Sequence, residues 1–290
     1  MNLRLSWRKN QPDLDALFRQ GFPSFVFGRN PEGLPDGIPV FCYHAADPET
    51  VEADLYFLKE NGYQSWSIAE LMRHLREGIH PKNRTVVLTV DDGACDLYSV
   101  MYPALKRYGF HAVAFVAPAF HRDAHDGPDH ARPCTWDELR EMERSGHVDV
   151  QAHTWSHRYI PNWPEPLDLV GIDSRYLHAI QRSDAGTVRD DLARAKQELE
   201  SQLNKRVAHL AFPMYRGTDS AVRTGRELGY ASFWWGTLPR RRANKPGDSP
   251  ERIVRISAEF IRRLPGEGRV ALHRIGAGRI ACAWRRKPKV

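Results

Sequence analysis

Short apolar runs alternate with amphipathic stretches along most of this 290-residue chain. The apolar runs are rich in β-branched and aromatic side chains and are bounded by turn residues, which is typical of strands. We expect strands at Gly37–His44, Thr85–Val90, His111–Val116, His147–Ala152, Val207–Phe212, Tyr230–Trp235 and Arg252–Ile256.

The amphipathic stretches between these runs predict helices. Ser67–Arg76 has a clear beginning, because Ser67 is a good N-cap and Glu70 follows three residues later, as in a capping box. Strands that alternate with helices favour right-handed crossovers and a mostly parallel sheet, open or closed. Pro161–Ser183 has weak periodicity and several prolines, so we expect a long surface loop there. The other helices are expected at Glu49–Glu60, Leu97–Tyr108, Thr135–Ser145, Thr187–Leu203 and Ser220–Leu228.

The composition is that of an ordinary globular protein, with 41% hydrophobic and 27% charged residues. The length allows one large domain with a substantial core, or two small ones. The cysteines are scattered and form no CxxC pair, which excludes zinc-finger spacing and a small disulfide framework. We therefore expect mostly buried free thiols. These cysteines are Cys42, Cys95, Cys134 and Cys282.

The chain is basic, with 42 Lys and Arg against 36 Asp and Glu and a formal net charge of +6. Part of the excess is local, at Arg240–Arg242 and in the tail Arg285–Lys289. We favour solvated surface for both; the alternative is attraction to phosphates, on a nucleotide-linked sugar or on an anionic membrane contacted by the tail. No recognition motif accompanies the charge, so we expect no nucleic-acid partner.

Targeting segments are not readable in the sequence. The residues after Met1 contain no apolar stretch of the kind that forms a signal peptide. No apolar run is long enough to cross a bilayer. We therefore expect a cytoplasmic protein without a transmembrane segment.

The candidate chemistry begins where the strand Thr85–Val90 runs into Asp91, Asp92 and Gly93. Parallel-sheet enzymes keep their chemistry at the carboxyl ends of strands. A glycine permits a sharp turn, which would let both carboxylates project from the strand end. Two carboxylates this close repel each other, and a metal cation would remove that cost. An acid pair alone could equally cap a helix.

Two histidines supply the second part of the pattern. His153 and His157 stand four residues apart directly after a predicted strand, so one helical turn or a tight loop would put both rings on one side. Residue 154 is threonine, so this is not the HExxH of zinc proteases, and a base must come from elsewhere; Asp91 is available. Two imidazoles and one carboxylate can hold a divalent metal with open positions, and metal-bound water of pKa about 7 is a nucleophile.

These segments resemble the motifs of the polysaccharide deacetylase family, the NodB-type carbohydrate esterases of family 4, over roughly Gly37–Ser257. Residues 89–93 resemble Thr-Phe-Asp-Asp-Gly with valine for phenylalanine, and residues 153–157 resemble His-(Ser/Thr)-x-x-His. Leu210–Tyr215 is similar to the third motif, although residues 214–217 depart from its usual Pro-Tyr-Gly turn. Tyr43-His44 and residues 56–63 resemble the branch with poly-N-acetylglucosamine deacetylases.

The resemblance implies a distorted (β/α) barrel with fewer than eight strands. The Pro, Gly and polar residues at 1–36 predict an irregular lead-in, and the charges predict a basic tail at 276–290, so we expect the catalytic domain at residues 37–275. The resemblance implies that Asp92, His153 and His157 bind the metal and that Asp91 is the general base. His44 matches the general acid of this branch, and His273 is the rival candidate. The three metal ligands, with Asp91 and His44, would form the reaction centre.

The resemblance also implies a substrate and a cofactor. We expect one divalent transition metal, zinc first, with cobalt, nickel or iron as alternatives. The reaction would remove an N-acetyl or similar small acyl group from an amino sugar in a glycan, a lipid-linked or a nucleotide-linked substrate. A backbone N–H near Tyr215 would help to hold the oxyanion. Tyr215, Pro213 and Trp155 would contact the substrate, while Trp234 and Trp235 are either part of a sugar platform or core aromatics.

Three alternatives stay open. The altered third motif suggests a catalytically inactive, carbohydrate-binding member of the same fold. A hydrolase of a non-sugar C–N amide bond would use the same residues. Two histidines and a carboxylate also form the site of non-haem iron oxygenases, but here the acid precedes both histidines by a long interval.

Overall fold

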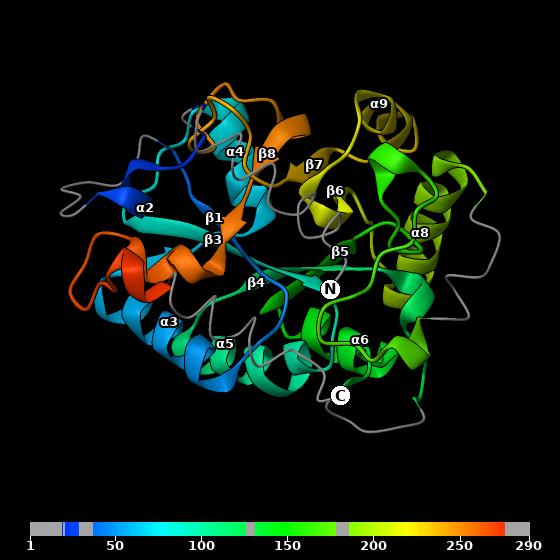
Figure 1. Ribbon diagram of the computed structural model, residues 1–290, viewed down its shortest axis with the longest axis horizontal. Coiled ribbons are helices and arrows are strands. Elements are labelled where there is room, and N and C mark those ends of the chain that lie inside the picture. The colour runs from blue at the N-terminus through cyan, green and yellow to red at the C-terminus, as the bar shows by residue number, and fades with distance from the viewer. Residues whose placement is uncertain (1–18, 20, 29–36, 126–130, 178–185, 276–290) are drawn as a thin grey trace.

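The computed structural model describes residues 19, 21–28, 37–125, 131–177 and 186–275, and it contains a parallel sheet curved into a barrel (Figure 1). The strands follow the order β8-β7-β6-β5-β4-β3-β1-β9, and β2 pairs with β3 off this path. They are β1 Val40–Tyr43, β2 Tyr63–Ser65, β3 Arg84–Asp92, β4 Ala112–Val116, β5 Val148–Ala152, β6 His209–Ala211, β7 Ser232–Trp235, β8 Ile253–Val254 and β9 Ile256–Ser257.

A single chain segment closes the barrel. β8 and β9 are separated only by Arg255. Ile253 of β8 pairs with Trp234 of β7, and Ile256 of β9 pairs with Phe41 of β1. The eight named strands of the ring therefore belong to seven continuous segments of the described chain, which confirms the predicted distorted (β/α) barrel. The expected single strand over Arg252–Ile256 is instead split at Arg255.

The helices begin where the sequence places capping residues. The capping box of Ser67 and Glu70 is present as predicted, and Thr135 and Thr187 start two further helices in the same way. The helices and short helical turns are α2 Ser24–Phe27, α3 Pro48–Glu60, α4 Ile68–Glu77, η1 Leu97–Met101, α5 Tyr102–Tyr108, η2 Pro118–Phe120, α6 Trp136–Arg144, η4 Ile160–Asn162, η5 Ser174–Tyr176, α8 Val188–Leu203, η6 Pro213–Tyr215, α9 Asp219–Glu227, η7 Pro250–Arg252 and η8 Ala258–Arg263.

Alternate residues of the strands face two different apolar clusters. The larger cluster joins one face of the strands to helix residues such as Leu55 and Leu105. The smaller one contains Val87, Phe115 and Trp234, and we place it inside the ring. Trp234 is fully buried there, with its ring 5.2 Å from that of Phe115, so the core interpretation of this residue is correct. Asp91 shares the face of Val87, which puts its carboxylate at the rim of the interior layer.

Two predicted irregular segments are more ordered than expected. Within the lead-in, α2 buries Phe25 and Val26 completely, and Arg263 Nε donates to the carbonyl of Val26 at 2.9 Å. Within Pro161–Ser183, Leu167 and Leu169 are buried. The described residues do not include residues 178–183 of that loop, most of the lead-in, the basic tail or Cys282. β2 was not predicted, because three residues are too few to show a periodic pattern.

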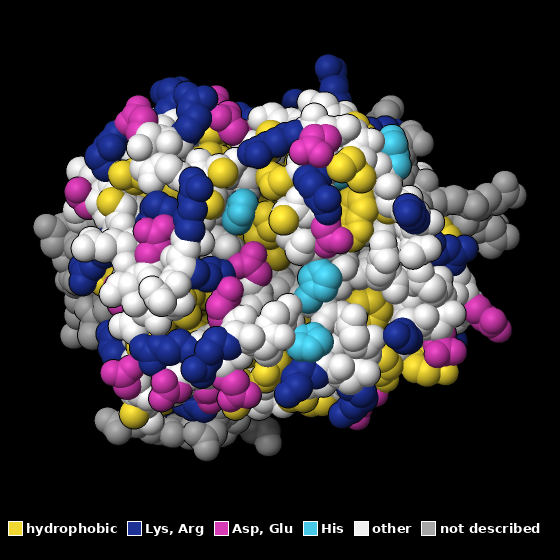
Figure 2. Space-filling view, turned by 180° about the vertical axis from the view of Figure 1, so that it is seen from behind, with side chains coloured by type: hydrophobic (Ala, Val, Ile, Leu, Met, Phe, Trp, Pro, Cys, Tyr) yellow, Lys and Arg dark blue, Asp and Glu magenta, His cyan; other side chains and the backbone are white. Residues whose placement is uncertain are grey.

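The distribution of charge on one face and the burial of the thiols agree with the sequence analysis. Figure 2 shows Lys and Arg interspersed with Asp and Glu on the face opposite to Figure 1, so the positive charge there is not gathered into one patch. Cys42, Cys95 and Cys134 are free and buried. In the described ranges, no helix combines the length and the apolar character needed to cross a membrane.

Candidate active site

The carboxyl end of β3 presents two buried acids. Asp91 and Asp92 are each 1% exposed. Asp92 has φ +74° and Gly93 has φ +73°, so the predicted turn begins one residue earlier than the glycine. A Cβ on Gly93 would lie 2.8 Å from Cε1 of His121, which leaves room only for glycine. Because of this turn, both carboxylates lie near one imidazole: Nε2 of His153 is 3.8 Å from Asp91 Oδ2 and 3.5 Å from Asp92 Oδ1.

The histidine pair lies in a tight loop after β5, the second of the two predicted possibilities. Thr154 and His157 have φ of +63° and +49°, and the two imidazole rings are 5.0 Å apart. Nδ1 of His153 lies 2.9 Å from the carbonyl of Ala211, and Nδ1 of His157 lies 3.2 Å from the carbonyl of Leu167. A carbonyl only accepts, so each Nδ1 donates, and each Nε2 is directed to the carboxylates.

Asp92, His153 and His157 form a compact group of metal-ligand type. Nε2 of His157 is 3.3 Å from Asp92 Oδ1, and one ligand atom from each residue lies within 4.8 Å of the others. Asp92 Oδ2 accepts from the N–H of Val170 at 2.7 Å, whereas the buried Oδ1 has no hydrogen-bond partner among the described residues. A carboxylate oxygen left unpartnered between two imidazole nitrogens fits a divalent transition metal.

Asp91 differs from Asp92 because a guanidinium neutralises it. Arg255 donates from Nη1 to Asp91 Oδ1 at 2.6 Å and from Nη2 to Oδ2 at 2.9 Å, and both side chains are buried. Burial alone would raise the pKa of the Asp91 carboxyl, but Arg255, with His153 and His44, holds that pKa below its ordinary value. Sequence reasoning missed Arg255, although a lone arginine in an apolar run was a signal.

The electrostatics of the metal-type group distinguish its members. Burial opposes ionisation of Asp92, yet the nearby charges of His157, His44 and His153 hold the pKa of this carboxyl well below its usual range. Burial lowers the pKa of His153 to about 4, against the opposing charge of Asp91. The pKa of His157 is raised, because Asp92 outweighs the effect of burial. At neutral pH, His153 is therefore uncharged and can offer a lone pair.

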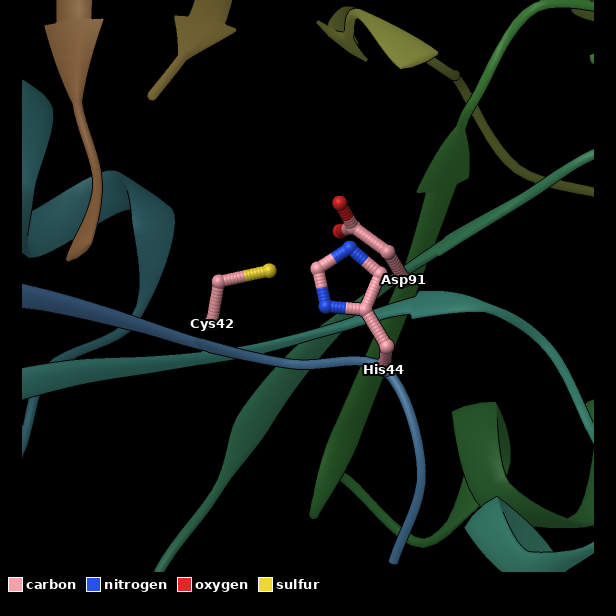
Figure 3. Close-up of side chains that lie close together, drawn as sticks. All are labelled: Cys42, His44 and Asp91. Atoms are coloured by element: carbon pink, nitrogen blue, oxygen red, sulfur yellow. The ribbon is translucent and has the colours of Figure 1, made fainter. Parts of the chain in front are cut away.

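His44 follows β1, and its side chain lies beside Asp91. Figure 3 shows its imidazole and the thiol of Cys42 beside the carboxylate of Asp91, and ligand-type atoms of the three lie within 4.8 Å of one another. This second group is a poor cation site, because Nη1 of Arg255 is already 3.5 Å from Cys42 Sγ and bound to Asp91. Burial also raises the pKa of Cys42 to about 12, which keeps the thiol protonated.

The third motif forms the turn η6 and brings a phenol to His44. The hydroxyl of Tyr215 is 3.4 Å from Nδ1 of His44, and the two rings are nearly perpendicular with centroids 5.3 Å apart. Met214 and Tyr215 both have positive φ, of +50° and +63°. The N–H of Tyr215 donates to the carbonyl of Phe212 at 3.0 Å. The N–H of Tyr215 itself is therefore engaged within the turn, and an oxyanion donor near Tyr215 stays a prediction.

Other predicted residues lie in different surroundings. The indole of Trp155 contacts α8, with the Arg194 guanidinium 3.5 Å from the ring centre and Nε1 donating to Glu198 at 2.6 Å. These contacts give no support to its predicted place in a sugar platform. Pro213 is buried at the start of η6. His273 is exposed within the helical residues 272–275, and it belongs to neither of the two groups described above.

The site places two acids and two histidines at the carboxyl ends of the barrel strands. The sequence profile of the family Polysaccharide deacetylase matches residues 78–233. This range includes both acids, both histidines and Tyr215. The chain therefore belongs to the polysaccharide deacetylase family.

Curated relatives are between 22% and 26% identical to the chain over the aligned residues. The poly-β-1,6-N-acetyl-D-glucosamine N-deacetylase of Escherichia coli K12 is 26% identical over 245 residues, which covers 71% of this chain and 36% of that protein. The protein of the same name from Staphylococcus aureus MSSA476 is 22% identical over 208 residues, covering 71% of this chain and 64% of that one. The chain thus spans less than two thirds of the length of these relatives.

Solved structures share the fold. IcaB from Ammonifex degensii aligns with a TM-score of 0.60 at 24% identity, covering 77% of this chain and 92% of that one. The Streptococcus pyogenes deacetylase PplD, in complex with acetate, aligns with a TM-score of 0.61 at 22% identity, covering 80% and 99%. At these identities the likeness shows the barrel architecture.

Proposed function

We propose that the chain is a metal-dependent hydrolase that removes an N-acetyl, or similar small acyl, group from an amino sugar. The substrate would be a glycan, a lipid-linked or a nucleotide-linked sugar. The observation that supports this most strongly is the unpartnered, buried Oδ1 of Asp92 between the Nε2 atoms of His153 and His157. Membership in the polysaccharide deacetylase family supplies the reaction class.

Asp92, His153 and His157 would hold the metal, for which zinc is our first choice and cobalt, nickel and iron are alternatives. When bound there, the metal would supply Lewis-acid polarisation of the amide carbonyl and a water of lowered pKa. The hydrogen bonds from the two Nδ1 atoms to the carbonyls of Ala211 and Leu167 fix the imidazole rings for this task.

Asp91 is the general base in this proposal. Its carboxylate stays ionised at neutral pH because of Arg255, and it stands beside the metal-type group without belonging to it. It takes a proton from the attacking water, whose oxygen forms the new bond to the carbonyl carbon. The bidentate contact with Arg255 holds both carboxylate oxygens in a fixed orientation.

His44 is the general acid. An amine leaves poorly as an anion, so cleavage of the C–N bond requires a proton on nitrogen. His44 is partly exposed, whereas His153 and His157 are buried. The hydroxyl of Tyr215 near Nδ1 would orient the ring toward the leaving amine. The products are a carboxylate such as acetate and the free amino sugar.

A catalytically inactive, carbohydrate-binding protein is the second candidate, and the altered third motif motivates it. The contacts of Tyr215 favour the first candidate, because the unusual Met214-Tyr215 turn still delivers the phenol to His44. A binding protein would have no need for a stoichiometric metal or for the charge arrangement around Asp91.

The test compares the wild type with Asp91→Asn. Metal content is measured after chelation and reconstitution with zinc, and amine release is followed on N-acetylglucosamine oligomers. We expect one zinc per chain in both proteins and a loss of activity on the order of 10²–10⁴-fold in the variant. Asp137→Asn, at an exposed carboxylate of α6, is the matched control. A variant that retains wild-type turnover would exclude Asp91 as the base, and a metal-free, inert wild type would favour the binding protein.

A further inference from the structure

A buried carboxylate lies under the loop that carries the two histidines. Asp191, in the first turn of α8, is 3% exposed. Its Oδ1 accepts from the N–H of Trp155 at 2.8 Å. Its Oδ2 accepts from both the N–H of Ser156, at 3.0 Å, and the hydroxyl of Ser156, at 2.5 Å. All three hydrogen bonds therefore end on two residues that lie between His153 and His157.

These hydrogen bonds act on a strained segment. Thr154 and His157, on either side of the bonded pair, have left-handed φ values without being glycine. Such a conformation is unfavourable for a residue other than glycine and persists only where its surroundings impose it. Asp191 is well placed to impose it, because two backbone N–H groups and one hydroxyl converge on its carboxylate. The left-handed conformation of His157 in turn directs Nε2 toward Asp92.

Capping of α8 does not account for Asp191. The capping box of this helix uses Thr187 and the neighbouring residue Asp190, whose Oδ2 accepts from the N–H and the hydroxyl of Thr187. Asp190 faces solvent, whereas Asp191 points inward. Burial raises the pKa of the Asp191 carboxyl, and the hydrogen bonds that offset part of this effect come from the histidine loop. Arg158 Nε donates to the hydroxyl of Ser156 at 3.1 Å.

We propose that Asp191 is a positioning residue of the metal site, which fixes the 154–157 loop so that the imidazoles of His153 and His157 are preorganised toward Asp92. This inference rests on the proposed function. Asp191 contacts neither the ligand atoms nor the substrate position, so its effect is on the affinity for metal, through the loop. Loss of a residue that orients metal ligands typically weakens metal binding by roughly 10–100-fold.

The experiment uses Asp191→Asn, in which the amide nitrogen cannot accept and at least one of the three hydrogen bonds is lost. Zinc affinity is measured by competition with a chromophoric chelator, and the fold of the zinc-free proteins is compared by circular dichroism. We expect zinc to bind about 10–100-fold more weakly, with kcat near that of the wild type at saturating zinc. Asp190→Asn, at the adjacent exposed position, is the matched control and should leave zinc affinity unchanged.

A second variant keeps the inference testable if Asp191→Asn does not fold. Ser156→Ala removes one bond to Oδ2 and leaves both backbone bonds, so we expect a smaller but measurable weakening of zinc binding. Zinc affinities of Asp191→Asn and Ser156→Ala within about twofold of the wild type would overturn this inference and leave the proposed function standing. A wild type that binds no stoichiometric zinc would overturn both.

Discussion

The helices around the barrel differ from the turns at the carboxyl ends of its strands in how the backbone is stabilised. Three helices begin with complete capping boxes, and α4 ends at a left-handed glycine, Gly78. Among the described residues, five of the seven non-glycine residues with positive φ instead lie in the three motif turns. These five are Asp92, Thr154, His157, Met214 and Tyr215. The helical shell satisfies its backbone locally, whereas the site keeps strain that only long-range contacts compensate.

Charges show the same difference. Arg252 and Asp219 form an ion pair at the surface, with side chains 40% and 72% exposed. Only three residues further on, Arg255 pairs with Asp91 at essentially zero exposure. Water solvates the first pair whether or not it forms, but the second pair has no such alternative. Removal of Arg255 should therefore lower the free energy of unfolding much more than removal of Arg252, although the two lie in one segment.

The largest effect is expected for Arg255→Met. This change leaves the Asp91 carboxylate buried without its partner, which should lower the free energy of unfolding by about 3–5 kcal/mol. Urea denaturation measures this loss. Arg252→Met is the matched control and should cost less than about 1 kcal/mol. The double variant Arg255→Met, Asp91→Asn should recover part of the stability, and strict additivity of the two changes would contradict the pairing.

A smaller effect is expected in the pH dependence of the free energy of unfolding, and it comes from His121, which lies behind the Gly93 turn. Burial lowers the pKa of His121 to about 4, and its Nδ1 lies 2.8 Å from the carbonyl of Cys134. The unfolded chain, with a pKa near 6.5, binds the proton first as pH falls, so the contribution is complete above about pH 6.5 and is lost toward pH 4. When the pH falls from 7.5 to 5, this residue alone should lower the free energy of unfolding by about 2 kcal/mol.

His121→Asn isolates that contribution, because an amide can still donate to the Cys134 carbonyl but does not titrate. The free energy of unfolding of zinc-free protein is measured by urea denaturation at both pH values. The variant should lose about 2 kcal/mol less than the wild type over this interval. Equal losses in the two proteins would show that His121 is protonated equally in the folded and unfolded states.

The smallest effect is expected in the helical shell. Thr135→Ala removes the hydroxyl that accepts from the N–H of Glu138 in the capping box of α6. We expect a loss of about 1 kcal/mol in the free energy of unfolding, measured by thermal denaturation, with amine release and zinc affinity unchanged. A large loss of activity would mean that shell and site are coupled more tightly than their contacts indicate.

The same difference explains what the sequence could predict. Capping boxes and β-branched runs depend on neighbours in the chain. The capping box of Ser67 with Glu70 was therefore predicted correctly, and the predicted strand Thr85–Val90 lies within β3. The acid and histidine motifs also identified residues that the structure brings together. Arg255 stands 164 positions from its partner Asp91, and a contact of that range leaves no periodic signal. Asp191 was hidden for the same reason, within an ordinary amphipathic helix.

The surroundings of Trp155 could not be predicted, because its position between two histidines says nothing about the direction of its side chain. A strand predicts alternating faces, but the residues after β5 form a loop with left-handed dihedral angles, to which no such rule applies. The indole consequently contacts α8. Loop conformation, rather than motif content, was the missing information.

The interruption between β8 and β9 has a consequence for the motions of the molecule. The barrel closes through a segment whose central residue, Arg255, also neutralises the Asp91 carboxylate. A fluctuation that separates β8 and β9 from their neighbours would therefore remove the counter-ion of Asp91. Opening would thus expose both sheet edges and an uncompensated negative charge in a single step, so its free energy should be high. Amide hydrogen exchange at Val254 and Ile256 should accordingly be among the slowest in the chain.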